Sequence, residues 1–138
     1  MVGKVCRTSK YGTMYKYIFA KTTHRGGSDT IKVKNHSADV GLILISKISK
    51  KHERFGKFII GRYKPLYLWN FYVKEKYQRQ GIGRNILKLV KEKYKGKELF
   101  LECRKDNNAY DLYLSEGFET VDTFNHCGEW AIMKLNNI

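Results

Sequence analysis

The sequence predicts an α/β (α+β) fold in a single domain that spans residues 1–138. Three observations predict it. Apolar runs of strand length recur along the chain, the segment from Ile82 to Tyr94 carries apolar residues at helical spacing, and a turn with two glycines joins that segment to the strand-like run before it. The length and a hydrophobic share of 42% are sufficient for one packed core.

The first 37 residues carry the weakest pattern. Met14–Ala20 is expected to form a strand, Arg25–Asp29 has the glycines of a turn, and Ile31–Lys34 alternates weakly between apolar and polar residues. No stretch of this region has the apolar spacing of a convincing amphipathic helix.

From residue 40 onward the pattern is clearer. Six apolar runs bounded by turn residues are expected to form strands: Val40–Ile48, Phe55–Ile60, Leu66–Val73, Leu99–Cys103, Phe118–Phe124 and Glu129–Leu135. Two helices are expected at Ile82–Tyr94 and Asn107–Glu116. The second helix begins at an N-cap that is Asp106, Asn107 or Asn108, and it ends at Gly117.

The most informative stretch is the turn Gln78–Gly83, which reads Gln-Arg-Gln-Gly-Ile-Gly. A turn between a strand and a helix leaves backbone N–H groups at the helix N-terminus, where the helix dipole also favours phosphate. A dinucleotide fingerprint would need a third glycine at Ile86, and a nucleotide-triphosphate loop would need Lys followed by Ser or Thr at Arg84 and Asn85. The turn is therefore predicted to bind a phosphate-bearing ligand of another kind.

The turn resembles the acyl-coenzyme A signature of the GNAT acetyltransferase superfamily, Gln/Arg-x-x-Gly-x-Gly/Ala, with Gln78, Gly81 and Gly83 at its fixed positions. A second block, Asn107–Phe118, is similar to the family's helix of form Asn-x-x-Ala-x-x-Leu-Tyr followed by Gly-Phe, although the motif's asparagine is displaced and Asp106 stands at its usual position. The two blocks stand in the family's order, and each follows a run of strand character. The resemblance covers roughly residues 39 to 135.

The resemblance implies a fold with a mixed, mostly antiparallel central sheet and flanking helices. In this family the central strand, here Leu66–Val73, splays from the next strand after a bulge. Family members usually build the acceptor site from one or two N-terminal helices, and those helices are expected to be reduced in this chain. The acceptor pocket is therefore not predicted.

The resemblance also implies that acetyl-CoA is bound as co-substrate. Backbone amides of the turn would hold its pyrophosphate, and the central strand would hold the pantetheine arm, with the Val73 N–H polarising the acetyl carbonyl. Asn107 is expected either to contact the coenzyme or to cap its helix. The coenzyme-binding residues expected in this way are Phe71, Tyr72, Val73, Gln78, Arg79, Gln80, Gly81, Ile82, Gly83, Arg84 and Asn107.

Two side chains are candidates for proton transfer. Tyr113 aligns with the family's general acid, the tyrosine that protonates the departing coenzyme thiolate. A base is also expected, because bringing a lysine-like amine of pKa ~10.4 to its neutral form at pH 7 costs about 4.6 kcal/mol. The stretch Leu66–Asn70 has no carboxylate, so Glu102 on the following strand is either the base, acting directly or through water, or a solvent-facing strand residue.

Composition excludes several other classes of protein. No apolar run approaches the ~20 residues of a membrane-spanning helix. Three cysteines and four histidines show neither disulfide nor metal-ligand spacing, so we expect reduced thiols, no metal site and a cytoplasmic location. The net charge is +14, and coenzyme phosphates account for part of it. The remainder indicates either an acidic partner, such as RNA, an acidic protein or an anionic metabolite, or lysines that only solvate the surface.

The sequence thus favours an N-acetyltransferase that transfers acetyl directly from acetyl-CoA to a primary amine. The acceptor remains open between a protein lysine or N-terminus, a small-molecule amine and an aminoacyl-tRNA. The alternative is a non-catalytic module on the same fold, which binds nucleic acid through basic loops at 47–57 and 91–97 or senses acyl-CoA. Either a monomer or a homodimer is compatible with the sequence.

Overall fold

The computed structural model describes residues 3–21, 28–61 and 64–138. These residues form two compact units, Met1–Ser46 with Trp69–Val90 and Lys47–Leu68 with Lys91–Ile138. Two α-helices are present in the described parts, α1 (Ile82–Lys93) and α2 (Ala109–Ser115). In the order in which they neighbour one another, the strands of the mixed sheet are β1 (Gly3–Thr8), β2 (Met14–Lys21), β3 (Asp29–Asn35), β4 (Ala38–Lys47), β5 (Leu66–Val73), β6 (Lys97–Arg104), β8 (Glu129–Asn137) and β7 (Glu119–Asn125).

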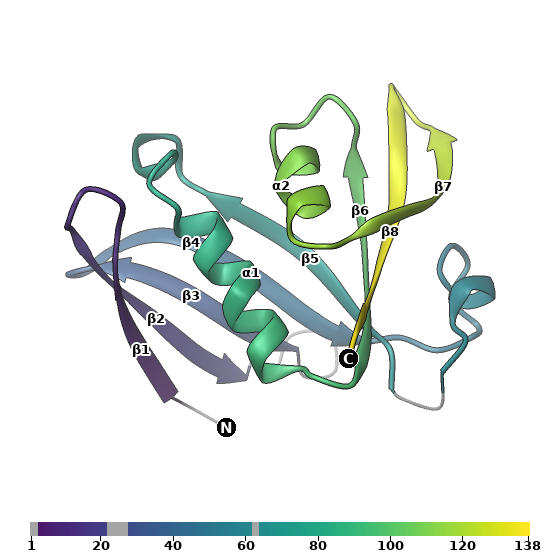
Figure 1. Cartoon of the computed structure of the whole chain (residues 1–138), viewed down its shortest axis with the longest axis horizontal. Coiled ribbons are helices and arrows are strands. Elements are labelled where there is room, and N and C mark those ends of the chain that lie inside the picture. Colours follow the sequence, from purple (N-terminus) through teal and green to yellow (C-terminus); the bar gives the residue numbers. More distant parts are fainter. Residues whose placement is uncertain (1–2, 22–27, 62–63) are drawn as a thin grey trace. The chain divides into compact units, whose positions relative to one another are not determined.

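The first unit is an antiparallel meander of β1 to β4 that carries helix α1 (Figure 1). Buried side chains alternate with exposed ones along its strands. At the start of β2, for example, Tyr15 and Tyr17 are buried while Met14 and Lys16 are exposed. The helix buries Ile82 and Ile86, and Asn85 Nδ2 donates to the Tyr17 hydroxyl over 3.3 Å. One face of the meander and one face of α1 therefore form the core of this unit.

The second half of β5 also belongs to the first unit, and it lies very close to β4. A Cβ atom on Gly41 would stand 2.7 Å from the Tyr72 carbonyl oxygen and 3.4 Å from the Val73 Cα. The Lys74 N–H donates to the Val40 carbonyl over 2.8 Å just beyond the end of the strand. Only glycine at position 41 permits this approach of the two backbones.

We expect Gly41→Ala to lower the free energy of unfolding by about 2 kcal/mol, because its methyl group must displace the backbone of β5. Gly3→Ala is the matched control, since a Cβ on Gly3 would meet only Phe19 Cδ2, at 3.9 Å. Urea unfolding of both variants measures the difference. Equal stability of the two variants would show that the approach at Gly41 is not tight.

Strand β5 contains a backbone irregularity at Asn70, whose φ is +52°. Asparagine enters this left-handed region more readily than most residues, because its short polar side chain can hydrogen-bond locally. Strand β5 pairs in parallel with β6, and the paired residues are Leu66 with Leu99 and Tyr67 with Phe100. On β5 this pairing ends before Asn70. The irregularity and the short parallel ladder agree with the bulged and splayed central strand that the family resemblance implies.

The second unit is built on β6, which pairs antiparallel with β8, as β8 does with β7. Its core on one face of β6 is a cluster of Phe55, Ile59, Phe100 and Ile132. Helix α2 lies against β6, and its Tyr113 ring contacts the Phe118 ring edge-on at 5.8 Å (Figure 1).

The strand predicted at Phe55–Ile60 is wrong. Residues Gly56–Phe58 form a 3₁₀ turn instead, and a Cβ on Gly56 would lie 2.1 Å from the Lys50 carbonyl oxygen, so the chain is tightly folded there. Most amides that a strand would offer to a neighbour are taken within the turn, since Gly56, Phe58 and Ile59 donate to the carbonyls of His52, Phe55 and Gly56. Just after the turn, Glu98 accepts from the Ile60 N–H at 3.1 Å and from the Gly61 N–H at 2.7 Å. The apolar run is buried, but not as a strand.

Glu98 is part of a buried ion pair with Lys134, whose Nζ lies 2.9 Å from Oε2. Burial by itself would raise the pKa of Glu98, but the hydrogen bonds from Lys134, Ile60 and Gly61 outweigh it and the net pKa is lowered. A carboxyl whose pKa is lower in the folded state contributes stability above its ordinary value of 4.5 and loses that contribution as pH falls through the folded pKa.

We therefore expect Glu98→Gln to cost about 3 kcal/mol at pH 7, because Lys134 would be left buried without its partner. The same variant should lose less further stability than the wild type between neutral pH and acid, since the titrating group has been removed. Unfolding by urea at a series of pH values tests this, with Glu119→Gln at an exposed strand position as the control. A pH profile of Glu98→Gln parallel to that of the wild type would contradict the assignment.

The other predicted elements are confirmed, with ends that differ by a few residues. Leu66–Val73 is found with the predicted bounds, Met14–Ala20 lies within β2, and the weak alternation at Ile31–Lys34 lies within β3. In the described part of the first 37 residues the regular elements are strands, which confirms the reduced helical region. Residues 25–27 of the predicted turn Arg25–Asp29 lie outside the described residues. Neither described helix has the length and hydropathy needed to span a membrane.

Candidate functional site

The turn between β5 and α1 is the centre of the candidate site. A 3₁₀ turn at Glu75–Tyr77 follows β5, and then Arg79 and Gly81 both adopt left-handed backbone conformations, with φ of +64° and +86°. The Asn85 N–H donates to the Gly81 carbonyl over 3.0 Å, which closes the first turn of α1. The amides before Asn85 have no acceptor within the helix, and the first turn holds no acidic residue. This is the geometry of an anion-binding helix N-terminus.

Two glutamine side chains hold the turn in place. Gln78 Nε2 donates to the Val73 carbonyl over 2.7 Å, so the turn is tied to the end of β5. Gln80 Nε2 donates to the Tyr77 carbonyl over 3.3 Å, and Gln80 Oε1 accepts from the Tyr15 hydroxyl over 3.0 Å. The side chains of both predicted coenzyme residues are therefore engaged within the protein, and their main-chain groups are the ones that a ligand would contact.

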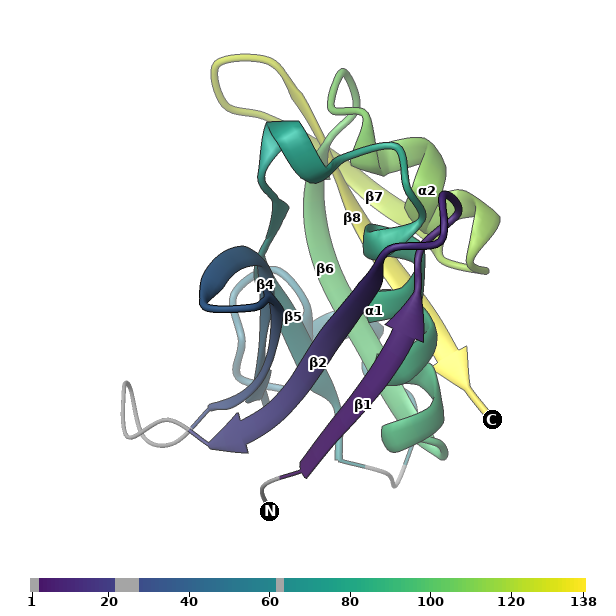
Figure 2. The same cartoon turned by 90° about the vertical axis from the view of Figure 1, so that its left-hand side faces the viewer.

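The hairpin of β1 and β2 supports the turn from the other side (Figure 2). At its tip the Ser9 hydroxyl accepts from the Thr13 N–H over 3.1 Å, and the Lys10 N–H donates to the Gln80 carbonyl over 3.1 Å. The Tyr15 ring meets the Tyr77 ring edge-on at 6.2 Å. Sequence reasoning missed this support, because the turn residues at 9–12 indicate a hairpin but not where it docks.

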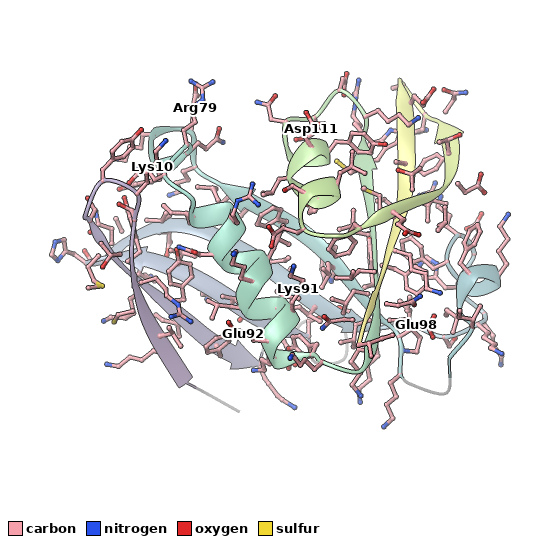
Figure 3. The ribbon with its side chains drawn as sticks, viewed as in Figure 1. Lys10, Arg79, Lys91, Glu92, Glu98 and Asp111 are labelled. Atoms are coloured by element: carbon pink, nitrogen blue, oxygen red, sulfur yellow. The ribbon has the colours of Figure 1, made fainter. Side chains whose placement is uncertain are left out.

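The turn has a strongly positive surrounding. Four cations, Lys74, Lys76, Arg79 and Arg84, lie within eleven residues that hold one carboxylate, Glu75. Lys10 adds a fifth cation from the hairpin tip, and Figure 3 shows it at the same end of the first unit as Arg79. Excess positive charge beside exposed amides favours a ligand with several phosphate charges.

The predicted pantetheine residues lie directly before this turn. Phe71 and Val73 are half-buried on β5, and Tyr72 is exposed between them. The structure thus brings Phe71–Val73 and Gln78–Arg84 together in the first unit. Tyr113, Glu102 and Asn107 belong to the second unit.

Tyr113 is buried in α2, with 6% of its surface exposed. Burial raises the pKa of Tyr113 well above its ordinary value, and the neighbouring Cys103 raises it further. The phenol is therefore protonated at neutral pH. Helix α2 ends as predicted, with Gly117 in the left-handed conformation at a φ of +99°.

The alternatives for the start of α2 are resolved by hydrogen bonding. Asn107 Oδ1 accepts from the Ala109 N–H over 2.9 Å, whereas Asn108 is helical at φ −56° and makes no side-chain cap bond. Asp106 accepts from Arg104 Nε and Nη2, at 3.1 and 3.0 Å. Asn107 therefore caps the helix, and its contact with a coenzyme stays a prediction.

Glu102 is not the solvent-facing residue of the second alternative. Its side chain is 13% exposed, and Oε2 accepts from Arg54 Nη1 over 2.6 Å. Successive strand residues point to opposite faces, so Glu102 and Cys103 lie on opposite faces of β6. Because Tyr113 lies beside Cys103, Glu102 and Tyr113 are on opposite sides of the same strand. Sequence reasoning gave no signal for Arg54, which is 48 residues away.

No group of three or more His, Cys, Asp or Glu side chains is placed to hold a metal ion in the described residues. The turn Gln78–Gly83 and the block Asn107–Phe118 are therefore the chemical features to compare with known proteins.

The fold and the family can be compared with known proteins. A family model described as an acetyltransferase (GNAT) domain matches residues 14–130. Arabidopsis thaliana NAA60 in complex with a bisubstrate analogue has a similar structure, with a TM-score of 0.68, 17% identity, and coverage of 80% of this chain and 76% of that chain. The same plant protein in complex with acetyl-CoA gives a TM-score of 0.66, 17% identity, and coverage of 78% and 75%.

The ribosomal-protein-S18-alanine N-acetyltransferase of Escherichia coli gives a TM-score of 0.61, 22% identity, and coverage of 83% of this chain and 70% of that chain. Among curated proteins a search found no match. Strand β1 lies before the first residue that the family model matches. Since the family model matches from Met14 to Trp130, which is most of the chain, this protein belongs to the GNAT acetyltransferase family.

Proposed function

We propose that the protein is an N-acetyltransferase that transfers an acetyl group directly from acetyl-CoA to a primary amine. The observation that carries the proposal is the turn before α1, where left-handed Arg79 and Gly81 precede a helix N-terminus without acidic residues. Membership of the GNAT family supports it, and so does the likeness in fold to an NAA60 solved with acetyl-CoA.

In this proposal the main chain of Arg79–Arg84 holds the pyrophosphate. Gly81 is suited to that role because no atom outside its chain neighbours lies within 4 Å of where its Cβ would be, so the space above it is open to a ligand. The main chain of Phe71–Val73 holds the pantetheine arm, and the Val73 N–H donates to the acetyl oxygen. A preorganised donor of this kind contributes on the order of 3 kcal/mol to the transition state.

Two glycines of matched geometry test the pyrophosphate site. Gly96 has a φ of +80° and, like Gly81, has open space for 4 Å around the point where its Cβ would be. We expect Gly81→Ala and Gly96→Ala each to lose about 1 kcal/mol of stability through left-handed strain. Only Gly81→Ala should weaken coenzyme A binding, by roughly tenfold or more, because its methyl group would occupy the space that a phosphate needs.

Isothermal titration calorimetry with coenzyme A, together with urea unfolding, measures both effects. If coenzyme A binds Gly81→Ala and Gly96→Ala with equal affinity, the pyrophosphate does not lie over Gly81.

The chemistry that we propose needs one proton to leave the amine and one to reach the sulfur. The amine nitrogen attacks the thioester carbon, the C–N bond forms, and the C–S bond breaks. Glu102 receives the amine proton directly or through water, and coenzyme A leaves as a thiolate that accepts the Tyr113 hydrogen bond and then takes its proton from solvent. Complete transfer from the phenol is uphill by more than about 2 kcal/mol, since its raised pKa exceeds 10 and that of a thiol is about 8.5.

Cys103 is poorly suited to carry the acetyl group in a two-step alternative. Burial raises the pKa of Cys103 to about 11, and the nearby Asp106 adds to the effect. The thiol is therefore protonated at neutral pH, and the thiolate is the nucleophilic form. Direct transfer to the amine is the simpler mechanism for these side chains.

Tyr113→Phe should lower kcat on the order of 10²-fold and leave the affinity for the coenzyme A thiol unchanged, because it removes the hydrogen bond that forms to the departing thiolate. Tyr110→Phe is the matched control in the same helix, where the hydroxyl hydrogen-bonds to Thr120 Oγ1 over 2.9 Å. That variant should lose some stability but keep its kcat. Thiol release from acetyl-CoA measures the rates.

The acceptors in that assay are peptides with a free α-amine, Nα-blocked peptides with one lysine, small diamines and aminoacyl-tRNA. If coenzyme A binds but none of these amines gives thiol release, the acyl-CoA-sensing alternative is favoured instead.

The surface of the first unit supports an acceptor that carries its amine beside acidic groups. Lys4, Ile18 and Lys32 are paired across β1, β2 and β3, and Lys16 lies directly opposite Lys34. Residues opposite one another share a face of the sheet, and like charges placed so are destabilising unless an acidic group offsets them. Lys34 pairs with Asp39 over 2.7 Å, whereas Lys4, Lys16 and Lys32 are exposed.

A further inference from the structure

Arg54 makes two contacts in the second unit that together describe a cation site. Its Nη1 donates to Glu102 Oε2 over 2.6 Å, and its guanidinium carbon lies 4.2 Å from the centre of the Phe124 ring. The three residues come from the segment before the 3₁₀ turn at Gly56–Phe58, from β6 and from β7. A carboxylate beside the face of an aromatic ring is the combination that recognises an organic cation.

The Phe124 ring, and the main chain that carries Glu102, are held without help from Arg54. Phe124 stacks on Trp130 with ring centres 5.9 Å apart and planes 12° apart, and Trp130 Nε1 donates to the His126 carbonyl over 2.9 Å. Glu102 is on the central part of β6, in register with Ile132 of β8. The site is therefore built on paired strands and is preorganised for a cation.

The main chain at Arg54 is held independently of the Arg54 side chain. The His52 Nδ1 atom accepts from the Arg54 N–H over 3.2 Å and from the Phe55 N–H over 3.3 Å, and Phe55 is fully buried. The Arg54 side chain is 47% exposed, against 13% for Glu102. A change of side-chain rotamer, without movement of the backbone, is enough to remove the guanidinium from the carboxylate.

We propose that Glu102 and Phe124 form the recognition site for the ammonium group of the acceptor, and that Arg54 occupies this site until an acceptor displaces it. The inference rests on the proposed function, in which Glu102 receives the amine proton. It names the form in which the acceptor arrives, a primary ammonium ion, which loses one proton to solvent before the nitrogen attacks and a second to Glu102 as the C–N bond forms. It also assigns to Arg54 the role of an internal competitor. While Arg54 is bound, Glu102 Oε2 is engaged and an amine cannot use it.

An internal competitor lowers the apparent affinity for the acceptor, because the acceptor binds only during the fraction of time that the site is open. Arg54 is held in the site by one partly exposed ion pair and one cation–π contact. Contacts of this strength keep Arg54 in the site for enough of the time to weaken acceptor binding roughly 3- to 30-fold. Arg54→Gln should therefore lower KM for the amine by a factor in that range, with kcat and coenzyme A affinity unchanged.

Lys57→Gln is the matched control for this variant. Lys57 is a cation three residues further along, in the 3₁₀ turn, but it pairs with Asp122 at 3.4 Å and lies over the Phe58 ring at 5.1 Å. Its replacement removes the same charge without touching Glu102 or Phe124. The KM for the amine should stay at the wild-type value in this control, and an equal fall in KM for both variants would overturn the proposal as an effect of net charge alone.

A second measurement does not depend on turnover. Butylammonium is titrated into the full-length protein, and NMR follows the Arg54 Nε–H and Trp130 indole N–H signals, with 1-butanol as the neutral probe. Butylammonium should shift the Arg54 signal saturably and 1-butanol should not. In Arg54→Gln the Trp130 signal should saturate at a lower butylammonium concentration, and in Glu102→Gln the saturable response should be lost.

The proposal is overturned if the Arg54 signal does not respond to butylammonium, or if Arg54→Gln binds butylammonium no more tightly than the wild type. Failure of the proposed function has a different signature, because coenzyme A titrations of the same proteins would then show no binding whether or not butylammonium displaces Arg54.

Discussion

The fold depends on the way β5 serves two neighbours. Its first residues, Leu66 and Tyr67, pair in parallel with β6, and the ladder ends before Asn70 turns into the left-handed region. On its other edge β5 neighbours β4, with the Ile48 N–H donating to Pro65 beyond one end and the Lys74 N–H donating to Val40 beyond the other. One strand thus takes part in two compact units, which divide between Leu68 and Trp69, and the next residue, Asn70, has a backbone conformation that most side chains disfavour.

In this arrangement a few residues with special backbone requirements shape the candidate site. Asn70 sets the direction of the main chain of β5, Gly41 lets β4 approach Tyr72 and Val73, and Gly81 brings the chain into α1. The proposed contacts to acetyl-CoA are made by main-chain groups, so they depend on backbone geometry more than on the identity of neighbouring side chains. The side chains of Gln78 and Gln80 then serve to fix that backbone.

Local sequence patterns predicted well the helices and strands whose conformation is set by their own residues. Leu66–Val73 was predicted with its observed bounds, because continuous apolar character marks a central strand, and α1 followed from its apolar spacing. Phe55–Ile60 failed because most of its amides bond within a tight turn, and because the Ile60 N–H binds Glu98, which is 38 residues away in the sequence. The burial of an apolar run was predicted correctly, but the partner that decides its conformation is set by the tertiary structure.

The same distinction applies to the candidate site. The glycine pattern and the Asn107–Phe118 block pointed to the turn and to Tyr113, since each is a contiguous motif. Nothing contiguous links Arg54 to Glu102 and Phe124, or the Lys10 hairpin tip to Gln80, because these contacts join residues far apart in the chain. Sequence alone therefore points to contiguous motifs better than it points to contacts between residues far apart in the chain.

The alternation of side chains along β6 separates the two proton-handling side chains of the proposed reaction. Glu102 and Cys103 are successive residues on opposite faces, with Arg54 and Phe124 around the first and Tyr113 beside the second. A base and an acid on opposite sides of one strand cannot neutralise each other by forming a direct hydrogen bond. Deprotonation of the amine and hydrogen bonding to the departing thiolate are then separate events at separate surfaces. Arg54 controls the first of them, because a carboxylate paired with a guanidinium must exchange that cation for the substrate ammonium before it can accept a proton.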